Sequence, residues 1–273
     1  MSRMENEYMT QKVITLVSDF GLRDPYVAEM KAVILTICPH ARIFDISHRV
    51  DKFDVRMGAF TLASAAPYFP EGTVHVAVVD PGVGSRRRPI IAETRRGYLV
   101  GPDNGVLMLA ALKEDLKHVY VIEERDYMLP KVSWTFHGRD VFAPAAAHLA
   151  RGIEASRFGK EVEEYVIPEF AKPQVKENVV CGEVLHVDDF GNIITSIPRT
   201  IVDDLHVRRG ELLRVRAGGK AESLLFCVAY GQVGKGKLLA IVGSHDFLEI
   251  SVNQGNAARF FGVKSGDPIV IMR

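Results

Sequence analysis

Short hydrophobic runs alternate with segments of helical periodicity over the first part of the chain. The run 13–18 is rich in β-branched residues, and from 25 to 38 apolar residues recur at helical spacing until Pro39 ends the pattern. Further strands are expected at 42–46, 74–79, 90–93, 97–100 and 119–122, and helices at about 53–66, 106–112 and 143–151. Strands that alternate with helices predict a mainly parallel sheet covered by helices.

The pattern changes in the second part of the chain. The stretch 155–177 is charged and contains Pro168 and Pro173, which indicates a linker, and beyond it short alternating strands are separated by turn residues. The sequence therefore predicts an α/β fold class with two domains. We expect a flexible tail at 1–11, an α/β domain at 12–170, and a smaller β-rich, barrel-like domain at 171–273.

The composition favours a small-molecule partner. Lys plus Arg and Asp plus Glu number 34 each, so no net field attracts nucleic acid or an acidic membrane. The first residues are polar, and no apolar run reaches the roughly 18 residues of a membrane span. Cys38, Cys181 and Cys227 are widely spaced and form no C-x-x-C pair. We expect a cytoplasmic protein without a zinc site.

Acidic residues follow three consecutive predicted strands. They are Asp19, the D-I-S-H run at 45–48, and Asp80, which opens the loop D-P-G-V-G. Ligands of open α/β sheets bind beyond the carboxyl ends of the strands, so these residues are candidates for a binding cleft. One such aspartate alone can equally be a cap or turn residue. Three in succession favour a site.

The loop 80–84 does not fit a phosphate-binding motif. It lacks the Lys and Ser/Thr of a P-loop and does not match G-x-G-x-x-G. Its glycines can instead let the backbone approach a ligand closely. Arg86, Arg87 and Arg88 follow, either as a solvated basic edge or with one guanidinium aimed at Asp80, which would keep that carboxylate ionised.

The F-H-G-R-D string at 136–140 places His137 just before a predicted helix. A histidine with aspartate and arginine neighbours can orient a water molecule and accept its proton, although a lone histidine is more often structural. The chain has no H-E-x-x-H motif and no tight cluster of histidines and carboxylates. We therefore expect no metal and no cofactor.

The second domain offers a polar turn at 188–192, with two carboxylates, an aromatic ring and an amide. This segment is either a tight hairpin or a ligand site. Further small and polar residues occur at 243–244, 248–250 and 253–258. An asparagine beside a flat aromatic ring suits a purine, because the amide matches the edge of adenine while the ring stacks on its face.

These strings, taken together, resemble the S-adenosyl-L-methionine hydroxide adenosyltransferases, the hydrolytic relatives of the fluorinase and chlorinase enzymes. The resemblance covers about 13–272. It rests on S-D-F-G (18–21), D-I-S-H (45–48), V-V-D-P-G-V-G (78–84), G-P-D-N-G (101–105), F-H-G-R-D (136–140), D-D-F-G-N (188–192), and L-E-I followed by N-Q-G-N-A-A near the end.

The resemblance implies hydrolysis of S-adenosyl-L-methionine at the ribose C5′ carbon to adenosine and methionine. It also implies an α/β domain and a β-barrel-like domain in a homotrimer, with substrate between the first domain of one subunit and the second domain of its neighbour. In this family an Asp, Arg and His set activates water. The matching residues are Asp80, Arg87 and His137, with Arg86 and Arg88 as neighbouring alternatives for the arginine.

The resemblance also assigns substrate-binding residues. Asp19 would hold the ribose hydroxyls, with Asp24, Pro25 and Tyr26 at the same end and Phe53 as a stacking aromatic; Asp188 and Ser244 would hold the methionine amino and carboxylate groups; Phe190, Asn192 and Val252 would surround adenine, and Glu249 lies in the matching L-E-I string. At two positions the sequence differs from the pattern of the family. Asp188 is followed by Asp189, and His245 stands where the halogenases carry an arginine.

Two other functions remain as alternatives. A halogenase of the same superfamily would use chloride or fluoride in place of water, but a halide site needs hydrogen-bond donors and no general base, and the halogenases carry an added loop for which the segment 90–100 has no room. A non-catalytic protein that binds adenosine or S-adenosyl-L-methionine would keep the same pocket without turnover.

Overall fold

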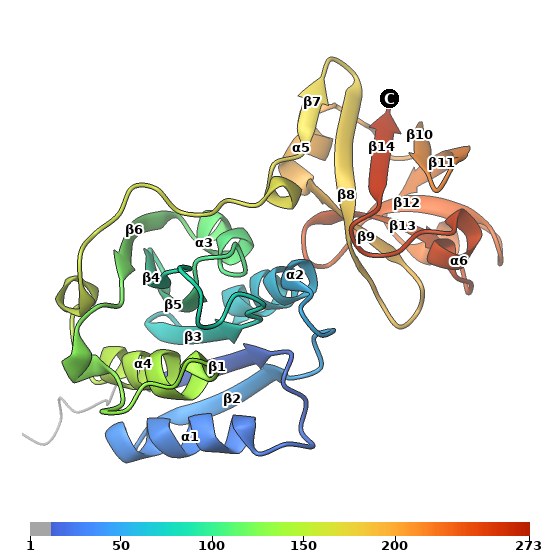
Figure 1. Ribbon diagram of the computed structural model, residues 1–273. Coiled ribbons are helices and arrows are strands. Elements are labelled where there is room, and N and C mark those ends of the chain that lie inside the picture. Colours follow the sequence, from blue (N-terminus) through green and yellow to red (C-terminus); the bar gives the residue numbers. More distant parts are fainter. Residues whose placement is uncertain (1–11) are drawn as a thin grey trace, which may run out of the picture. The chain divides into compact units, whose positions relative to one another are not determined.

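The computed structural model describes residues 12–273, and the predicted tail at 1–11 lies outside this part (Figure 1). The chain forms two compact units that divide between Ile167 and Pro168. Each unit has its own hydrophobic core.

The first unit alternates strands with helices. Its elements are β1 (Val13–Ser18), α1 (Tyr26–Ile37), β2 (Arg42–Ser47), α2 (Val55–Ala65), β3 (Thr73–Val78), β4 (Pro89–Thr94), β5 (Gly97–Pro102), α3 (Met108–Lys113), β6 (Leu116–Val121), a π-helical turn (Gly138–Phe142) and α4 (Ala143–Ala150). Every residue of β1 and β3 is buried, as in strands covered on both faces.

The strands of this unit form one sheet in the order β2-β1-β3-β5-β4-β6. The pairs β1–β2, β1–β3 and β3–β5 are parallel, whereas β4 is antiparallel to both β5 and β6. Apolar residues of α1 and α4 belong to the core on one face, and those of α2 and α3 to the core on the other (Figure 1). The predicted α/β fold with a mainly parallel sheet is confirmed, with an antiparallel edge.

Helix α2 begins later than its periodicity predicts. Phe53 has a φ of 66°, in the left-handed region, and therefore stands outside the helix. Asp54 is the N-cap, and its side chain accepts a hydrogen bond from the Met57 amide at 2.9 Å. The cap moves Phe53 from the expected helix into the preceding loop.

The second unit is a closed β-barrel. Its elements are β7 (Gln174–Lys176), β8 (Val179–Val187), β9 (Ile193–Pro198), α5 (Arg199–Asp204), β10 (Leu212–Ala217), β11 (Lys220–Cys227), β12 (Leu238–Val242), β13 (Phe247–Val252), α6 (Ala257–Phe261) and β14 (Pro268–Met272). The strand order β14-β10-β11-β12-β13-β9-β8 closes through the β8–β14 pair, which confirms the predicted barrel-like domain. β7, which lies inside the predicted linker, extends β8.

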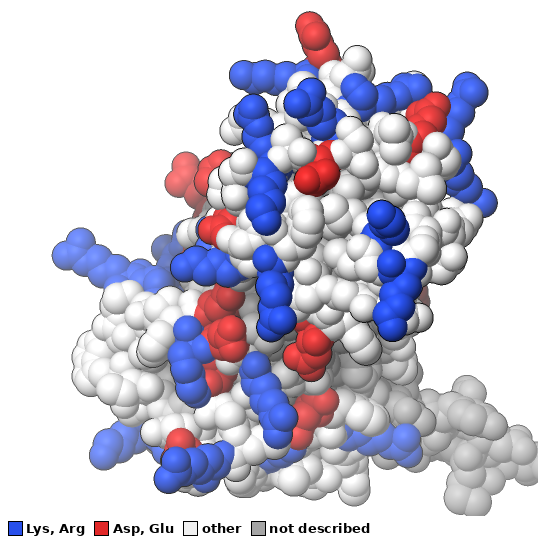
Figure 2. All heavy atoms as spheres, turned by 90° about the vertical axis from the view of Figure 1, so that its right-hand side faces the viewer, with Lys and Arg blue, Asp and Glu red and all other residues white. Residues whose placement is uncertain are grey.

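The surface carries charges of both signs. On the face shown in Figure 2, Lys and Arg side chains are interspersed with Asp and Glu side chains. Within residues 12–273, no helix is long and apolar enough to cross a membrane.

Candidate active site

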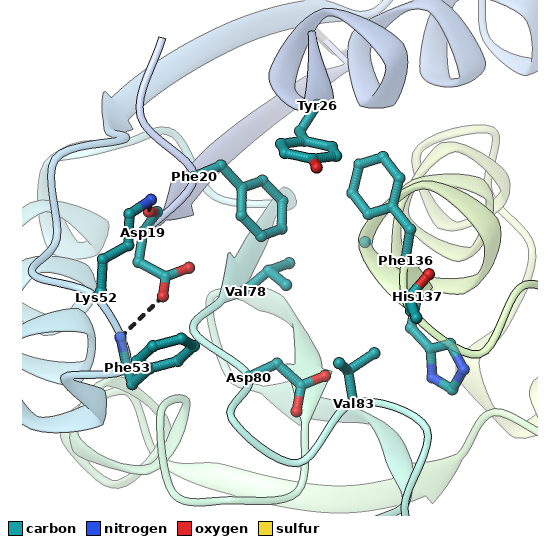
Figure 3. A pocket seen from close by; sticks show the side chains of 12 residues that line it. Asp19, Phe20, Tyr26, Lys52, Phe53, Val78, Asp80, Val83, Phe136 and His137 are labelled. Carbon is teal, nitrogen blue, oxygen red and sulfur yellow. Dashed lines mark hydrogen bonds between the residues drawn. The ribbon is translucent and has the colours of Figure 1, made fainter. Parts of the chain in front are cut away.

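The first unit contains a cavity of about 390 Å³ next to the carboxyl ends of β1 and β3 (Figure 3). Its walls are formed by Asp19, Phe20, Tyr26, Lys52, Phe53, Val78, Asp80, Val83, Thr135, Phe136, His137 and Gly138. Five residues expected from the sequence therefore share one cavity: Asp19, Tyr26, Phe53, Asp80 and His137. Asp24 and Pro25 are exposed and do not belong to its walls.

Arg87 joins Asp80 to His137. Its Nε lies 3.0 Å from both carboxylate oxygens of Asp80, and its Nη2 lies 2.5 Å from Asp80 Oδ2. The same Nη2 lies 2.8 Å from His137 Nδ1. The Arg87 and Asp80 side chains are only 8% and 5% exposed, so the ion pair is largely shielded from solvent. A buried, bidentate arginine fixes the carboxylate in one orientation.

The loop that carries Asp80 is held from two sides. Asn104, in the G-P-D-N-G string, donates through Nδ2 to the Val79 carbonyl at 2.8 Å. Gly84 has a φ of 74°, and a Cβ there would lie 2.4 Å from the Trp134 carbonyl oxygen. Only glycine permits this contact between the Asp80 loop and the loop that leads to His137.

The structure distinguishes the three consecutive arginines. Arg88 pairs with Asp103, at 2.6 Å, and also donates to the Glu164 carbonyl. Arg86 is exposed. The geometry therefore brings Arg87, as the resemblance implied, to Asp80.

His137 precedes the π-helical turn Gly138–Phe142, and such turns are frequent at functional sites. Burial, and then the charge of Arg87, lower the pKa of His137 below its ordinary value of 6.5. The imidazole is therefore neutral at pH 7. Because Arg87 can only donate, Nδ1 must accept, and the ring proton of the neutral imidazole is on Nε2. A hydrogen bond with the Ser133 backbone acts in the opposite direction on the pKa of His137.

Asp19 forms the opposite wall of the cavity (Figure 3). It is 6% exposed, and its Oδ2 accepts a hydrogen bond from the Phe53 amide at 2.9 Å. Its backbone carbonyl accepts a hydrogen bond from Lys52 Nζ. The side chain of Phe53 is 68% exposed at the cavity mouth.

Three aromatic rings form another wall. Phe20, Tyr26 and Phe136 contact one another with ring centroids 5.1 to 5.7 Å apart. Phe20 and Lys52 were not expected from the sequence, although each adjoins a residue that was. Phe136 stood in the F-H-G-R-D string without an assigned role. The sequence signal that could have identified Phe20, Lys52 and Phe136 was their position next to Asp19, Phe53 and His137.

In the second unit, Asp188 organises its own turn. Oδ1 accepts hydrogen bonds from the Phe190 amide at 3.0 Å and the Asn192 amide at 2.9 Å, and Oδ2 accepts one from Asn192 Nδ2 at 2.8 Å. Asn192 is 8% exposed, whereas Phe190 is 79% exposed. Asp189 is exposed. Asp188 and Asn192 are thus in direct contact, with the ring of Phe190 beside them in the solvent.

Glu249 is buried in the barrel at 7% exposure. Its Oε1 accepts hydrogen bonds from Tyr230, at 2.6 Å, and from Ser251, at 2.7 Å. Burial, and then Glu249, raise the pKa of Tyr230, to which Asp188 also contributes. Tyr230 therefore lies near both carboxylates, a relationship that its sequence position did not indicate. Ser244 is exposed, and Val252 is half-buried at the end of β13.

Within the described residues, no three His, Cys, Asp or Glu side chains are grouped so that they could hold a metal ion.

Two family models match the chain. The model of the SAM hydroxide adenosyltransferase N-terminal domain matches residues 14–159, and that of the C-terminal domain matches residues 182–270. The chain belongs to the SAM hydroxide adenosyltransferase family.

Individual known proteins are similar to the chain over nearly their full lengths. The chain is 39% identical to the (R)-S-adenosyl-L-methionine hydrolase of Thermus thermophilus, over 95% of this chain and 99% of the relative. A crystal structure of an uncharacterised conserved protein from Thermotoga maritima superimposes with a TM-score of 0.86 at 42% identity, covering 95% of this chain and all of that chain. The fluorinase of Nocardia brasiliensis is more distant, at 27% identity over 93% of this chain and 94% of the relative.

Proposed function

We propose that this chain hydrolyses S-adenosyl-L-methionine at the ribose C5′ carbon, releasing adenosine and L-methionine. The observation that carries the proposal is the Asp80–Arg87–His137 set, in which Asp80 and His137 line a cavity large enough for a ligand and Arg87 joins them. Membership of the family and the name of the Thermus relative support it.

In the proposed reaction, water attacks C5′ as the bond from C5′ to sulfur breaks. The electron pair of that bond goes to sulfur, which leaves as the neutral thioether of methionine, and the proton of the water goes to Asp80. Arg87 holds Asp80 in place and neutralises charge at the site. Positioning of this kind can supply effective molarities of about 10⁵ M or more. No cofactor takes part in this scheme.

From the sequence, both Asp80 and His137 were expected to accept the proton of the water. The contacts of His137 favour a narrower assignment. Nδ1 of His137 is engaged by Arg87, and the ring also bonds to the Ser133 backbone. This arrangement favours Asp80 as the proton acceptor. His137 then acts on the water through its hold on Arg87.

The substrate-binding part of the proposal follows the family resemblance. Asp19 binds the ribose hydroxyls, with Tyr26 and Phe53 beside it, and Asp24 and Pro25 remain candidates at the same end. Asp188, Phe190, Asn192, Ser244, Glu249 and Val252 bind the adenine and methionine groups. The aromatic rings that line the same cavity as Asp80 can attract the positive sulfonium. We further propose a homotrimer that acts in the cytoplasm, with each active site built from two copies.

A halogenase function is not supported. Asp80 lines the cavity, and a halide beside its carboxylate would face a negative hydrogen-bond acceptor. Strands β4 and β5 are joined by Arg95 and Arg96 alone, which leaves no place for the loop expected of the halogenases.

The test is incubation of the protein with S-adenosyl-L-methionine in H₂¹⁸O, with and without chloride, followed by mass spectrometry. We expect adenosine with one ¹⁸O in its 5′-hydroxyl, unlabelled methionine and no chlorinated nucleoside. Asp80→Asn keeps the size of the side chain and should reduce turnover by about 10² to 10⁴. Binding of adenosine without turnover by the wild-type protein would leave only a binding function.

A further inference from the structure

The D-I-S-H string has no part in the proposed reaction. Its first and last residues, Asp45 and His48, nevertheless contact each other, and His48 contacts Ser18, the residue before Asp19. His48, 4% exposed, lies with Nδ1 2.8 Å from Ser18 Oγ. Its Nε2 lies 3.0 Å from Asp45 Oδ1. The other oxygen of Asp45 pairs with Lys31 at 2.6 Å. A continuous polar chain thus runs from the protein surface to the residue before Asp19.

The direction of these hydrogen bonds follows from their chemistry. Burial alone would raise the pKa of Asp45, but its interactions with Lys31 and His48 outweigh it and lower the pKa, so Asp45 is ionised at neutral pH. The contact of His48 Nε2 with Asp45 Oδ1 is close but poorly aligned for a hydrogen bond, so it acts mainly as a charge interaction. The negative carboxylate still favours the imidazole proton on Nε2. Nδ1 then accepts from the Ser18 hydroxyl, and Ser18 Oγ is left to accept from the Phe20 amide at 3.3 Å.

This order of side chains, carboxylate to imidazole to serine, is also that of serine hydrolases, where it activates a nucleophile. Here Ser18 is only 1% exposed and is absent from the walls of the cavity. Its hydroxyl cannot reach a substrate. The arrangement therefore acts on the protein itself.

The structural consequence is a clamp on the loop 18–21. The His48 imidazole binds Ser18 at the start of the loop, and the His48 carbonyl accepts a hydrogen bond from the Gly21 amide at 2.8 Å. Four residues further along the chain, Lys52 binds the Asp19 carbonyl. Phe53 then fixes Asp19 Oδ2, so one carboxylate oxygen is held while the group faces the cavity (Figure 3).

We propose that His48 and Ser18 are positioning residues, which act through the loop 18–21 to set the orientation of the Asp19 carboxylate toward the ribose of the substrate. This inference rests on the proposed function, in which Asp19 binds the ribose hydroxyls. A carboxylate that must accept hydrogen bonds from hydroxyl groups needs its oxygens in a defined direction. Loss of the clamp should therefore weaken recognition of the ribose while leaving the rest of the ligand bound.

The test compares the affinities of adenosine and 2′-deoxyadenosine by calorimetry. The wild-type protein should prefer adenosine by about tenfold or more, because the deoxy compound leaves a charged acceptor without its hydroxyl. In Ser18→Ala, the affinity for adenosine should fall until most of that preference is lost, while the affinity for 2′-deoxyadenosine should change little. A purely structural role would weaken both ligands alike.

Thr15→Val is the matched control. Thr15 also lies on β1, is buried, and bonds to a buried histidine, His75, at 2.7 Å. Both substitutions remove one such hydroxyl, but Thr15 does not line the cavity. We expect Thr15→Val to lower the melting temperature about as much as Ser18→Ala does and to keep the ribose preference.

Variants of His48 provide a second, independent measurement. His48→Asn can place an amide oxygen near the position of Nδ1 and should retain part of the preference, whereas His48→Leu should abolish it. If the wild-type protein prefers adenosine and both Ser18→Ala and His48→Leu keep the full preference, the positioning role is wrong and the proposed function stands. If the wild-type protein binds the two nucleosides equally, the role of Asp19 in the proposed function fails.

Discussion

His137 Nδ1 accepts a hydrogen bond from Arg87 Nη2 across 2.8 Å, and that nitrogen is therefore occupied in the ground state of the site. The same guanidinium group also donates to both carboxylate oxygens of Asp80. Two predictions follow from this geometry, one on the arginine and one on the dependence of activity on pH.

Replacement of Arg87 by lysine should impair catalysis although the positive charge is kept. An ammonium group cannot reproduce the planar fork that spans Asp80 and His137. Loss of one buried, charge-assisted hydrogen bond costs about 1.5 to 3 kcal/mol, so kcat should fall about 10-fold to 100-fold. Arg86→Lys, at an exposed neighbouring position, is the control and should leave kcat unchanged. Equal kcat values in the two variants would exclude Arg87 from the site.

The profile of kcat/KM against pH should stay flat on the acidic side until below pH 6.5. Burial and Arg87 lower the pKa of His137, so its protonation, which would block acceptance from Arg87, occurs only below the ordinary value. His137→Asn offers a non-titrating acceptor to Arg87 and should shift the acidic limb further down. Initial rates between pH 4.5 and 8 measure both curves. An acidic limb centred above pH 6.5 would contradict the assignment.

Stability should also depend on pH through His75, which is remote from the active site. Burial, and then Arg96, lower the pKa of His75 to about 4. The unfolded chain takes up a proton near pH 6.5, but the folded chain does not until about pH 4. The unfolding free energy should therefore fall by about 2 kcal/mol from pH 7 to pH 5 on account of this group. Urea denaturation of wild type and His75→Asn at both pH values measures the difference, which should be smaller in the variant.

Asn192→Asp should destabilise the second unit and weaken adenosine binding. The new carboxylate would replace the amide that donates to Asp188 Oδ2 at 2.8 Å, so two negative groups would face each other at a site 8% exposed. We expect a loss of about 1 to 3 kcal/mol in unfolding free energy and at least about tenfold weaker adenosine binding. The melting temperature at pH 7, and calorimetry with adenosine, provide the two readings.

The same substitution at Asn256, whose side chain packs on Gly191 of the same turn without bonding to Asp188, gives a control. Asn256 caps α6 by accepting a hydrogen bond from the Arg259 amide at 2.6 Å, a role that requires only an acceptor. Asn256→Asp should therefore leave stability nearly unchanged, since aspartate caps equally well. A similar loss in both variants would show that the contact between Asn192 and Asp188 is not what matters.

The sequence by itself determined the alternation of strands and helices in the first unit and the placement of Asp19 and Asp80 after β1 and β3. These features are local, because burial imposes a period on the residues of each element and a strand must end where its apolar run ends. The prediction that the D-I-S-H run follows a strand was wrong, because β2 extends to Ser47 and contains Asp45. Strand β1 was predicted at 13–18 and is observed there. The strings that ended those strands also carried the family resemblance, and hence the expectation of a water-activating set.

The tertiary structure decided which side chains meet. Periodicity could not separate three adjacent arginines, because the choice of Arg87 depends on the path of the Asp80 loop and on the arrival of His137 from a segment 50 residues away. The contact of Tyr230 with Glu249 and that of Ser18 with His48 likewise join positions that no local rule relates. Barrel closure through β8 and β14 has the same origin, since pairing between distant strands is set by the packed backbone and not by the composition of either strand.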